Sequence, residues 1–293
     1  MKKILFILIL LATLFTAYHF WPNNSGQVLG ETSSNQVTST KLTDLDLYFF
    51  DVGQGDATMI KKDNFELLVD GGPDNKVIEK LGEYLPYGDR KIEAVLLTHP
   101  HSDHVAGLVE VLRRYQVEKI YLTGALHTAP DYLEFLKLIK EKNIATVLID
   151  KVQDIQITPD IAVKIPYPGK SFYQVRPENL NNSSIVFKLS YISSTVLFMG
   201  DFENEETLAS STVAVQVLKV GHHGSTNAND KNFLVKVEPL VAIISVGLKN
   251  SYGHPHYRTL YYLKNLGAKI LRTDESGDIK LRSDGQNFQI ATP

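Results

Sequence analysis

Apolar and polar positions alternate along the first half of the chain in a way that predicts strands and helices in turn. Short apolar runs that end at aspartate or glycine are typical of strands leading into turns, and apolar residues spaced three and four apart predict helices. The expected strands are Leu45–Asp51, Ala57–Lys61, Phe65–Asp70, Ile92–Thr98, Ile120–Leu122 and Ala145–Ile149. The expected helices are Val77–Tyr84, His104–Tyr115 and Tyr132–Lys142.

The second half of the chain is richer in strands. Apolar runs predict strands at Ile161–Ile165, Ile185–Ser190, Thr195–Met199, Val213–Val220 and Val241–Val246, with helices around Asn232 and Leu260. Because strand-rich segments are interleaved with helices in both halves, we expect a layered α/β sandwich.

The N-terminus has the pattern of an export signal. Lys2 and Lys3 precede an apolar run over residues 4–17, and aromatic residues follow it. This run approaches the length of ~18–20 residues that spans a bilayer, and a small-x-small cleavage site is hard to find. We expect residues 1–21 to be a single-pass anchor in the cell membrane, with the rest of the chain outside the cytoplasm. Secretion after signal cleavage is the alternative.

A polar segment separates this anchor from the rest of the chain. Residues 22–43 are dominated by Asn, Ser, Thr, Gln and Gly, a composition that cannot bury a core and is typical of a flexible linker. The remaining residues, 44–293, form one expected domain.

Composition and charge narrow the chemistry. The chain has 293 residues, a net charge of −3 and no cysteine. The absence of cysteine excludes disulfide bonds, thiolate zinc ligands and a cysteine nucleophile. The negative net charge gives no overall positive field toward nucleic acid, although a local groove can still be basic.

Most of the nine histidines lie in three short clusters, each just after a predicted strand. In the first cluster, His99 and His101 are two residues apart at an extended strand end, so both side chains can bind one metal. The chain then turns into a helix, which lets Asp103 and His104 face a second metal. Imidazole and carboxylate groups suit zinc, manganese or iron.

Three further elements can complete this site. Asp201 ends a strand after Gly200 and can place one carboxylate between two cations. His222 and His223 leave a buried strand into a Gly–Ser turn and can supply a metal ligand and a proton-transfer group. The sequence leaves open which of the two binds the metal. Our working assignment makes His222 a metal ligand and His223 a catalytic residue. His254, fixed between a glycine and a proline, is a further ligand or acid.

These residues resemble the metallo-β-lactamase superfamily, whose H-x-H-x-D-H signature is matched by His99–His104. Within that superfamily, seven segments resemble, in the same order, the ComEC-type hydrolase domain of DNA-uptake (competence) proteins. They are DVGQGDA (Asp51–Ala57), LVDGG (Leu68–Gly72), THPHSDH (Thr98–His104), NNSS (Asn181–Ser184), MGD (Met199–Asp201), KVGHHGS (Lys219–Ser225) and NSYGHPH (Asn250–His256). The large membrane channel region of ComEC proteins is absent, so we expect a stand-alone version with its own anchor.

The resemblance implies a fold and a metal centre. The fold is a four-layered αβ/βα sandwich over residues 44–293, with two divalent metal ions, zinc or manganese, at the edge between two sheets. Asp70 is expected to orient a ligating histidine from behind. Other residues expected behind the ligands or at the substrate rim are Asp51, Gln54, Asp56, Asn182 and Ser225. For Asp51, Gln54 and Asp56 a role in turn geometry is the alternative.

One departure from the superfamily pattern concerns the first metal. Another histidine usually lies between the first cluster and the bridging aspartate. Here only His127 does, and it comes too early, while Asn181 and Asn182 occupy the neighbourhood. We therefore expect either that His222 or His254 completes the ligand set, or that one site fills only when substrate is bound.

The expected reaction is metal-assisted hydrolysis, in which Asp201 bridges the two cations. Many superfamily phosphodiesterases carry aspartate at the bridging position, and the ComEC resemblance suggests a DNA strand as substrate. The net charge and the lack of an obvious basic, aromatic stripe argue against DNA. The alternatives are hydrolysis of a small ester, lactone, amide or cell-wall fragment, and a non-catalytic tethered module of DNA uptake. No protein partner is predicted.

Overall fold

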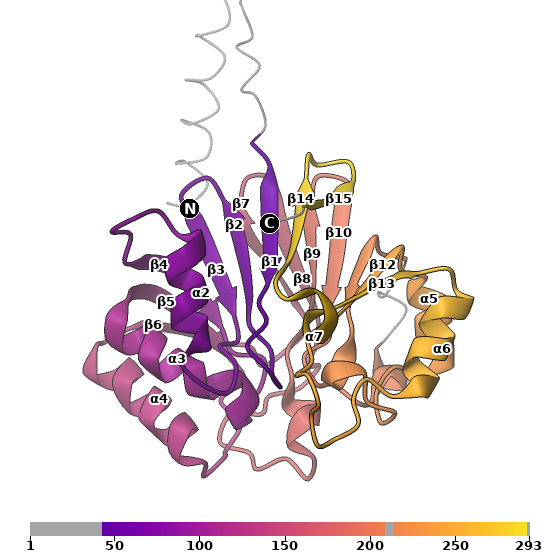
Figure 1. Ribbon diagram of the computed structural model, residues 1–293. Coiled ribbons are helices and arrows are strands. Elements are labelled where there is room, and N and C mark those ends of the chain that lie inside the picture. Colours follow the sequence, from indigo (N-terminus) through magenta and orange to yellow (C-terminus); the bar gives the residue numbers. More distant parts are fainter. Residues whose placement is uncertain (1–42, 209–213, 292–293) are drawn as a thin grey trace, which may run out of the picture. The chain divides into compact units, whose positions relative to one another are not determined.

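Two β-sheets packed face to face form the centre of the fold (Figure 1). The structure is a computed structural model and describes residues 43–208 and 214–291. The predicted anchor and linker lie outside these residues, Thr43 excepted. Within the described ranges, no helix is both long enough and apolar enough to cross a membrane.

The first sheet has eight strands in the order β15-β14-β1-β2-β3-β4-β5-β6. Their bounds are β1 Leu45–Phe49, β2 Thr58–Lys62, β3 Phe65–Val69, β4 Lys91–Leu96, β5 Gln116–Leu122, β6 Ala145–Leu148, β14 Ile279–Ser283 and β15 Phe288–Ala291. The strands from β3 to β6 run parallel to one another, and the others pair antiparallel.

The second sheet has seven strands in the order β13-β12-β11-β10-β9-β8-β7. Their bounds are β7 Gln153–Thr158, β8 Ile161–Tyr167, β9 Val186–Tyr191, β10 Ser194–Phe198, β11 Val217–Lys219, β12 Val241–Ile244 and β13 Lys269–Arg272. Here the strands from β10 to β13 are parallel.

Helices cover the outer faces of both sheets (Figure 1). The first sheet carries α2 Lys76–Tyr84, α3 Ser102–Arg114 and α4 Pro130–Glu141, and the second carries α5 Lys231–Val237 and α6 Tyr257–Asn265. The short helices are η1 Leu180–Ser183, η2 Glu205–Thr207, η3 Gly221–Gly224 and α7 Thr273–Ser276. This helix–sheet–sheet–helix order confirms the predicted four-layered sandwich.

Three apolar cores separate the four layers. Leu68 and Phe135 belong to the core between the first sheet and its helices, and Leu218 and Leu263 to the core under α5 and α6. The core between the sheets contains aromatic side chains, including the stacked rings of Phe187 and Phe198, whose centroids are 4.5 Å apart. Because this central core holds the two sheets together, it fixes the distance between the strand ends of one sheet and those of the other.

Four strands were not predicted: β7, β13, β14 and β15. Their burial patterns contain many half-exposed or exposed positions, so they lack the apolar runs on which the sequence prediction relied. The strand expected at Val213–Val220 is shorter, because β11 spans only Val217–Lys219. Its first predicted residue, Val213, lies outside the described residues.

Every predicted metal ligand follows the carboxyl end of a parallel strand. The loop after β4 leads into α3 and carries the first histidine cluster, while the loops after β10 and β11 carry Asp201 and the His222–His223 pair. Carboxyl ends of neighbouring parallel strands meet at one edge of a sheet, which is where α/β proteins place their binding sites. The fold therefore gathers these residues at one edge.

The position of α3 depends on two glycines. A Cβ atom on Gly107 would lie 1.9 Å from the carbonyl oxygen of Gly71, and one on Gly71 would lie 2.6 Å from the amide nitrogen of Leu108. The backbone of α3 thus contacts the turn after β3, with the amide of Gly107 donating to the carbonyl of Gly72 at 3.0 Å.

Gly107→Ala should lower the free energy of unfolding by about 1–3 kcal/mol, because the added methyl group overlaps backbone atoms that hold the turn. Gly82→Ala, in α2 with no atom within 4 Å of the added Cβ, is the matched control and should raise stability by up to about 1 kcal/mol. Urea unfolding followed by circular dichroism measures both changes. Equal effects of the two substitutions would contradict the packing described above.

Candidate metal centre

The first group of ligand atoms comes from the loop between β4 and α3. His99 is buried and His101 is half-buried, and His99 Nε2 lies 3.0 Å from His101 Nδ1. Together with the carboxylate of Asp201, they form a group in which all ligand atoms lie within 4.8 Å of one another. Two imidazole nitrogens and a carboxylate oxygen at this separation suit one divalent cation.

The second group combines the start of α3 with the second sheet. It consists of Asp103, His104, Asp201 and His223. His104 Nε2 is 3.4 Å from Asp201 Oδ1, and His223 Nε2 is 3.2 Å from Asp103 Oδ2 and 3.6 Å from Asp201 Oδ2. Since Asp201 belongs to both groups, its carboxylate is placed to bridge two cations.

Asp70 lies behind His104. Its carboxylate accepts a hydrogen bond from the backbone amide of Thr98 at 2.8 Å and from the hydroxyl of Thr98 at 2.7 Å, and it contacts His104 Nδ1 at 2.8 Å. A proton on His104 Nδ1 satisfies this contact and leaves Nε2 directed at Asp201. This is the orienting contact that carboxylates commonly make with ligating histidines.

His223 is oriented in the same way from the other side. Its Nδ1 lies 2.9 Å from the carbonyl oxygen of Ser245 and 3.3 Å from Asp56 Oδ1. Asp56 in turn pairs with the ammonium group of Lys219 at 2.6 Å, and both side chains are buried. Two acceptors therefore hold the proton on Nδ1 and turn Nε2 toward the ligand group.

Lys219 was missed by the sequence reasoning. The available signal is a lysine within the apolar run of β11, since a lysine is almost never fully buried unless it is paired. Asp56, predicted at the rim, lies beneath the site as the partner of this lysine.

His222 does not join any ligand group found in the described part of the chain. Its Nδ1 lies 2.7 Å from Glu203 Oε1, and its Nε2 is 3.8 Å from Asp201 Oδ2. Both histidines of the pair have positive φ angles, 47° for His222 and 51° for His223, and this turn directs the second imidazole toward Asp103. The geometry thus favours the reverse of our working assignment, with His223 as the ligand.

Asn181 and Asn182 both form hydrogen bonds with Glu203. The Nδ2 of Asn181 donates to Glu203 Oε1 at 3.0 Å, and its Oδ1 is buried without a hydrogen-bond partner among the described residues. The Oδ1 of Asn182 accepts from the backbone amide of Glu203 at 3.0 Å. Asn182 therefore supports the loop after β10. Glu203, which sequence reasoning missed, joins this loop to His222.

A cavity of about 250 Å³ opens onto the ligand groups. Gln54 and His254 are part of its lining, and burial together with neighbouring histidines lowers the pKa of His254 to about 4. A neutral imidazole at pH 7 is suited to accept a proton or a hydrogen bond, which makes the predicted acid role less favourable.

The other predicted rim residues stabilise turns. Asp51 Oδ1 accepts from the amide of Gly53 at 3.1 Å, and Ser225 Oγ accepts from the amide of Asn227 at 3.1 Å. Neither side chain is part of the lining of the cavity. For Asp51 the turn alternative therefore describes the contacts better than a role at the rim.

The residues at the centre fit divalent cations. Among the buried polar atoms without a hydrogen-bond partner are His104 Nε2 and Asp201 Oδ1, which face each other inside the second group. Burial alone would disfavour the charged carboxylate of Asp201, but the neighbouring imidazoles His223 and His104 outweigh it and hold the pKa of Asp201 well below its usual range. Burial also opposes protonation of His223, yet nearby carboxylates raise its pKa to about 10. Bound cations would take the place of these protons.

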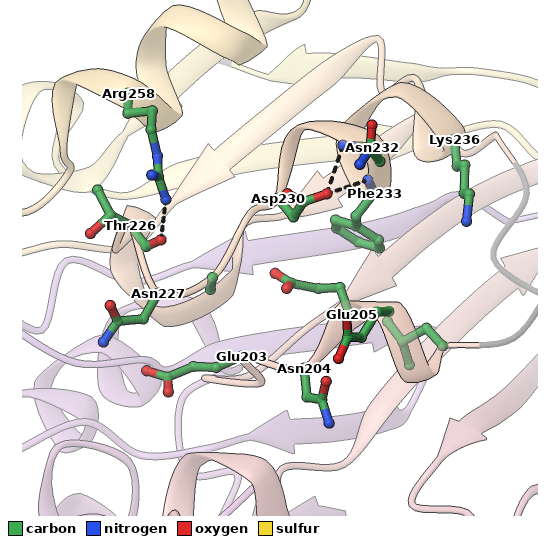
Figure 2. A pocket seen from close by; sticks show the side chains of 13 residues that line it. Glu203, Asn204, Glu205, Thr226, Asn227, Asp230, Asn232, Phe233, Lys236 and Arg258 are labelled. Atoms are coloured by element: carbon green, nitrogen blue, oxygen red, sulfur yellow. Dashed lines mark hydrogen bonds between the residues drawn. The ribbon is translucent and has the colours of Figure 1, made fainter.

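A larger cavity of about 510 Å³ has Glu203 in its lining (Figure 2), and the carboxylate of that residue contacts His222. Two of its carboxylates accept hydrogen bonds from nearby backbone amides: Asp230 caps α5 by accepting from the amide of Asn232 at 2.8 Å, and Glu205 accepts from the amide of Asn229. No histidine is in its lining, and none of the ligand groups found in the described residues falls within it. The chemistry therefore belongs to the smaller cavity.

Comparison with known families agrees with this geometry. A family model described as "Metallo-beta-lactamase superfamily" matches residues 50–248, which include every member of the two ligand groups. The chain belongs to this superfamily. The predicted resemblance to competence proteins is confirmed by the relatives that the sequence matches.

Two relatives and one solved structure illustrate the match. "ComE operon protein 3" of Bacillus subtilis (strain 168) is 29% identical over 199 residues, covering 67% of this chain and 25% of the relative. "Competence protein ComA" of Neisseria gonorrhoeae is 26% identical over 245 residues, covering 79% of this chain and 31% of the relative. The chain thus spans a quarter to a third of their length. The metallo-beta-lactamase fold protein YhfI from Bacillus subtilis has the same fold, with a TM-score of 0.55 and 13% identity over 80% of this chain and 99% of that chain.

The two groups predict different metal losses in two variants. Asp201→Ala should abolish tight binding at both sites, because its carboxylate belongs to both groups, whereas His223→Ala should leave the first group intact and lose about one metal per chain. Metal content after dialysis, measured by elemental analysis, separates these outcomes. His127→Ala, outside both groups, is the control with unchanged content. Equal metal content in the Asp201 and His223 variants would contradict a bridging role for Asp201.

Proposed function

We propose that this chain is a metal-dependent phosphodiesterase that acts on nucleic acid in DNA uptake. The observation that carries the proposal is the sharing of Asp201 between two groups of buried and half-buried ligands beneath one cavity. When bound, two divalent cations there would acidify a water molecule and neutralise charge that develops on phosphate oxygens. Either manganese or zinc suits the imidazole and carboxylate donors.

The chain's own residues have separate parts in this proposal. His99, His101 and Asp201 would hold one cation, and Asp103, His104 and His223, again with Asp201, would hold the other. The buried partners Asp70 and Asp56 hold the last two imidazoles in their orientations. His254, neutral at pH 7 and at the wall of the cavity, accepts a proton or binds a substrate oxygen.

The place of action is part of the same proposal. The basic and then apolar pattern of residues 1–21 supports attachment to the cell membrane, with the hydrolase domain outside the cytoplasm. The names of the competence relatives support a role in DNA uptake. Phosphodiester hydrolysis suits that role, because the backbone of a DNA strand is joined by phosphodiester bonds.

A small uncharged substrate is the second candidate. Among the described residues, no lysine or arginine lines the cavity over the ligand groups. Hydrolysis of an ester, lactone or amide needs no cationic groove. The lining of the cavity therefore favours an uncharged substrate over a nucleic acid.

The full chain, loaded with manganese or zinc, should hydrolyse bis-p-nitrophenyl phosphate and DNA. The double variant His101→Ala/Asp103→Ala removes one ligand from each group and should lower both rates by at least ~10³-fold, since catalysis of this kind depends on the metal. It also controls for contaminating nucleases. Release of p-nitrophenol and gel electrophoresis of DNA measure the two rates.

Three results would redirect the proposal. Hydrolysis of the small diester without DNA would retain the metal chemistry and point to small phosphodiesters. Inactivity on both, with metal bound, would discard the phosphodiesterase and leave the ester, lactone or amide candidate. DNA binding by a metal-free, inactive chain would favour the non-catalytic module.

A further inference from the structure

Two carboxamide side chains, Gln54 and Asn181, are part of the lining of the cavity over the ligand groups. Asn181 donates from its Nδ2 to Glu203 Oε1 at 3.0 Å. Gln54 uses its oxygen instead, because its Oε1 accepts from the backbone amide of Gly247 at 3.1 Å. The Nε2 of Gln54 forms no hydrogen bond with any residue that the structure describes. Gln54 therefore keeps its N–H donors available at the wall of the cavity.

The contact between Gln54 and Gly247 joins a loop of the first sheet to a loop of the second. Gln54 lies between β1 and β2, and Gly247 follows β12. A Cβ atom on Gly247 would lie 2.6 Å from the backbone nitrogen of Gln54, so this close approach requires glycine. The backbone contact and the hydrogen bond together restrict how the carboxamide of Gln54 can turn.

The loop that carries Gly247 is held by the side chain of Asn250. The Nδ2 of Asn250 donates to the carbonyl oxygen of Gly247 at 3.0 Å and to that of His254 at 2.7 Å. Its Oδ1 accepts from the backbone amides of Tyr252 at 3.2 Å and His254 at 3.0 Å. Gln54 thus has a fixed partner for its Oε1, which leaves its Nε2 as the end of the side chain that a ligand can reach.

The rest of the lining has few groups that can stabilise negative charge. No lysine or arginine is among its described residues, and its carboxylates, Asp103 and Asp201, belong to the ligand groups. Its hydroxyl groups belong to Ser102 and Tyr252, whose side chains are exposed to water. Besides the imidazoles, Gln54 Nε2 is therefore the side-chain N–H group of the described lining that has no protein partner.

We propose that Gln54 Nε2 donates a hydrogen bond to a phosphoryl oxygen of the substrate, at the point where negative charge develops. Hydrolysis at a metal centre places charge on such oxygens, and an N–H donor held in position beforehand stabilises it. The role in turn geometry uses only Oε1 of Gln54, so the two roles belong to different atoms of one side chain. The inference rests on the proposed function and adds a substrate-binding residue to it.

Two substitutions of similar size separate these atoms. Gln54→Glu keeps an oxygen that accepts from Gly247 and loses the donor, whereas Gln54→Met loses both. In the metal-loaded full chain, both should raise Kd for inorganic phosphate by about tenfold or more, because each removes a hydrogen bond to a charged oxygen. Isothermal titration calorimetry measures Kd, and thermal unfolding should show a lower Tm for Gln54→Met alone.

An added negative charge and a lost metal ion are the effects to control for. Gln289→Glu, at an exposed position of β15 outside the lining, adds the same charge and should retain wild-type Kd. Metal content should be unchanged in both Gln54 variants, since Gln54 belongs to neither ligand group. With bis-p-nitrophenyl phosphate, kcat/KM should fall by about tenfold or more in both.

The outcomes separate this inference from the proposed function. Weaker phosphate binding in both Gln54 variants, without any hydrolysis by the wild type, would support the donor and overturn the phosphodiesterase. Hydrolysis with wild-type kcat/KM in both variants would overturn the donor and leave the phosphodiesterase in place. A loss in Gln54→Met alone would assign the effect to the Gly247 contact, and a loss in Gln54→Glu alone would assign it to charge. Either result, or no phosphate binding by the metal-loaded wild type, contradicts the inference.

Discussion

The buried carboxylate of Asp201 is the constraint on which the rest of the site depends. It lies at the centre of two ligand groups, within 3.8 Å of His99 and 3.4 Å of His104, and it is almost completely shielded from water. A buried anion is costly unless cations surround it. The loops after β4 and β11 surround it with imidazoles instead of lysines or arginines, and imidazoles are ligands for a metal ion.

The scaffold keeps this shell in place through contacts that lie one layer deeper. The Gly71–Gly107 contact sets α3 against the turn after β3, and Asp70 at that turn orients His104. On the opposite side, the buried pair of Lys219 and Asp56 joins β11 of the second sheet to the loop before β2 of the first. Breaking such a pair costs roughly 3–5 kcal/mol, so the two halves of the centre are tied by an interaction that also positions His223.

Local spacing made part of this site predictable. The two-residue repeat of His99 and His101 at a strand end, followed by the start of a helix at Asp103 and His104, fixes which side chains share a face, and the structure brings these four together with Asp201. The layered α/β arrangement followed from the alternation of apolar strands and amphipathic helices, and the four-layered order was implied by the resemblance to the superfamily. Strands β7, β13, β14 and β15 were not predicted, since their mixed burial leaves no apolar run.

Other features depend on geometry that spacing does not encode. Which of His222 and His223 faces the ligand groups depends on two consecutive positive φ angles. Histidine as a residue type does not predict such angles. The partnership of Lys219 with Asp56 joins residues 163 positions apart and appears only when the sheets pack.

The most direct test of the bridging carboxylate is electron paramagnetic resonance of the chain loaded with two equivalents of manganese. Cations held about 3.5–4 Å apart by one carboxylate should give an exchange-coupled dimanganese spectrum with closely spaced hyperfine lines. Asp201→Ala should remove this signal. A wild-type spectrum of isolated six-line manganese, at full occupancy, would contradict a centre built around Asp201.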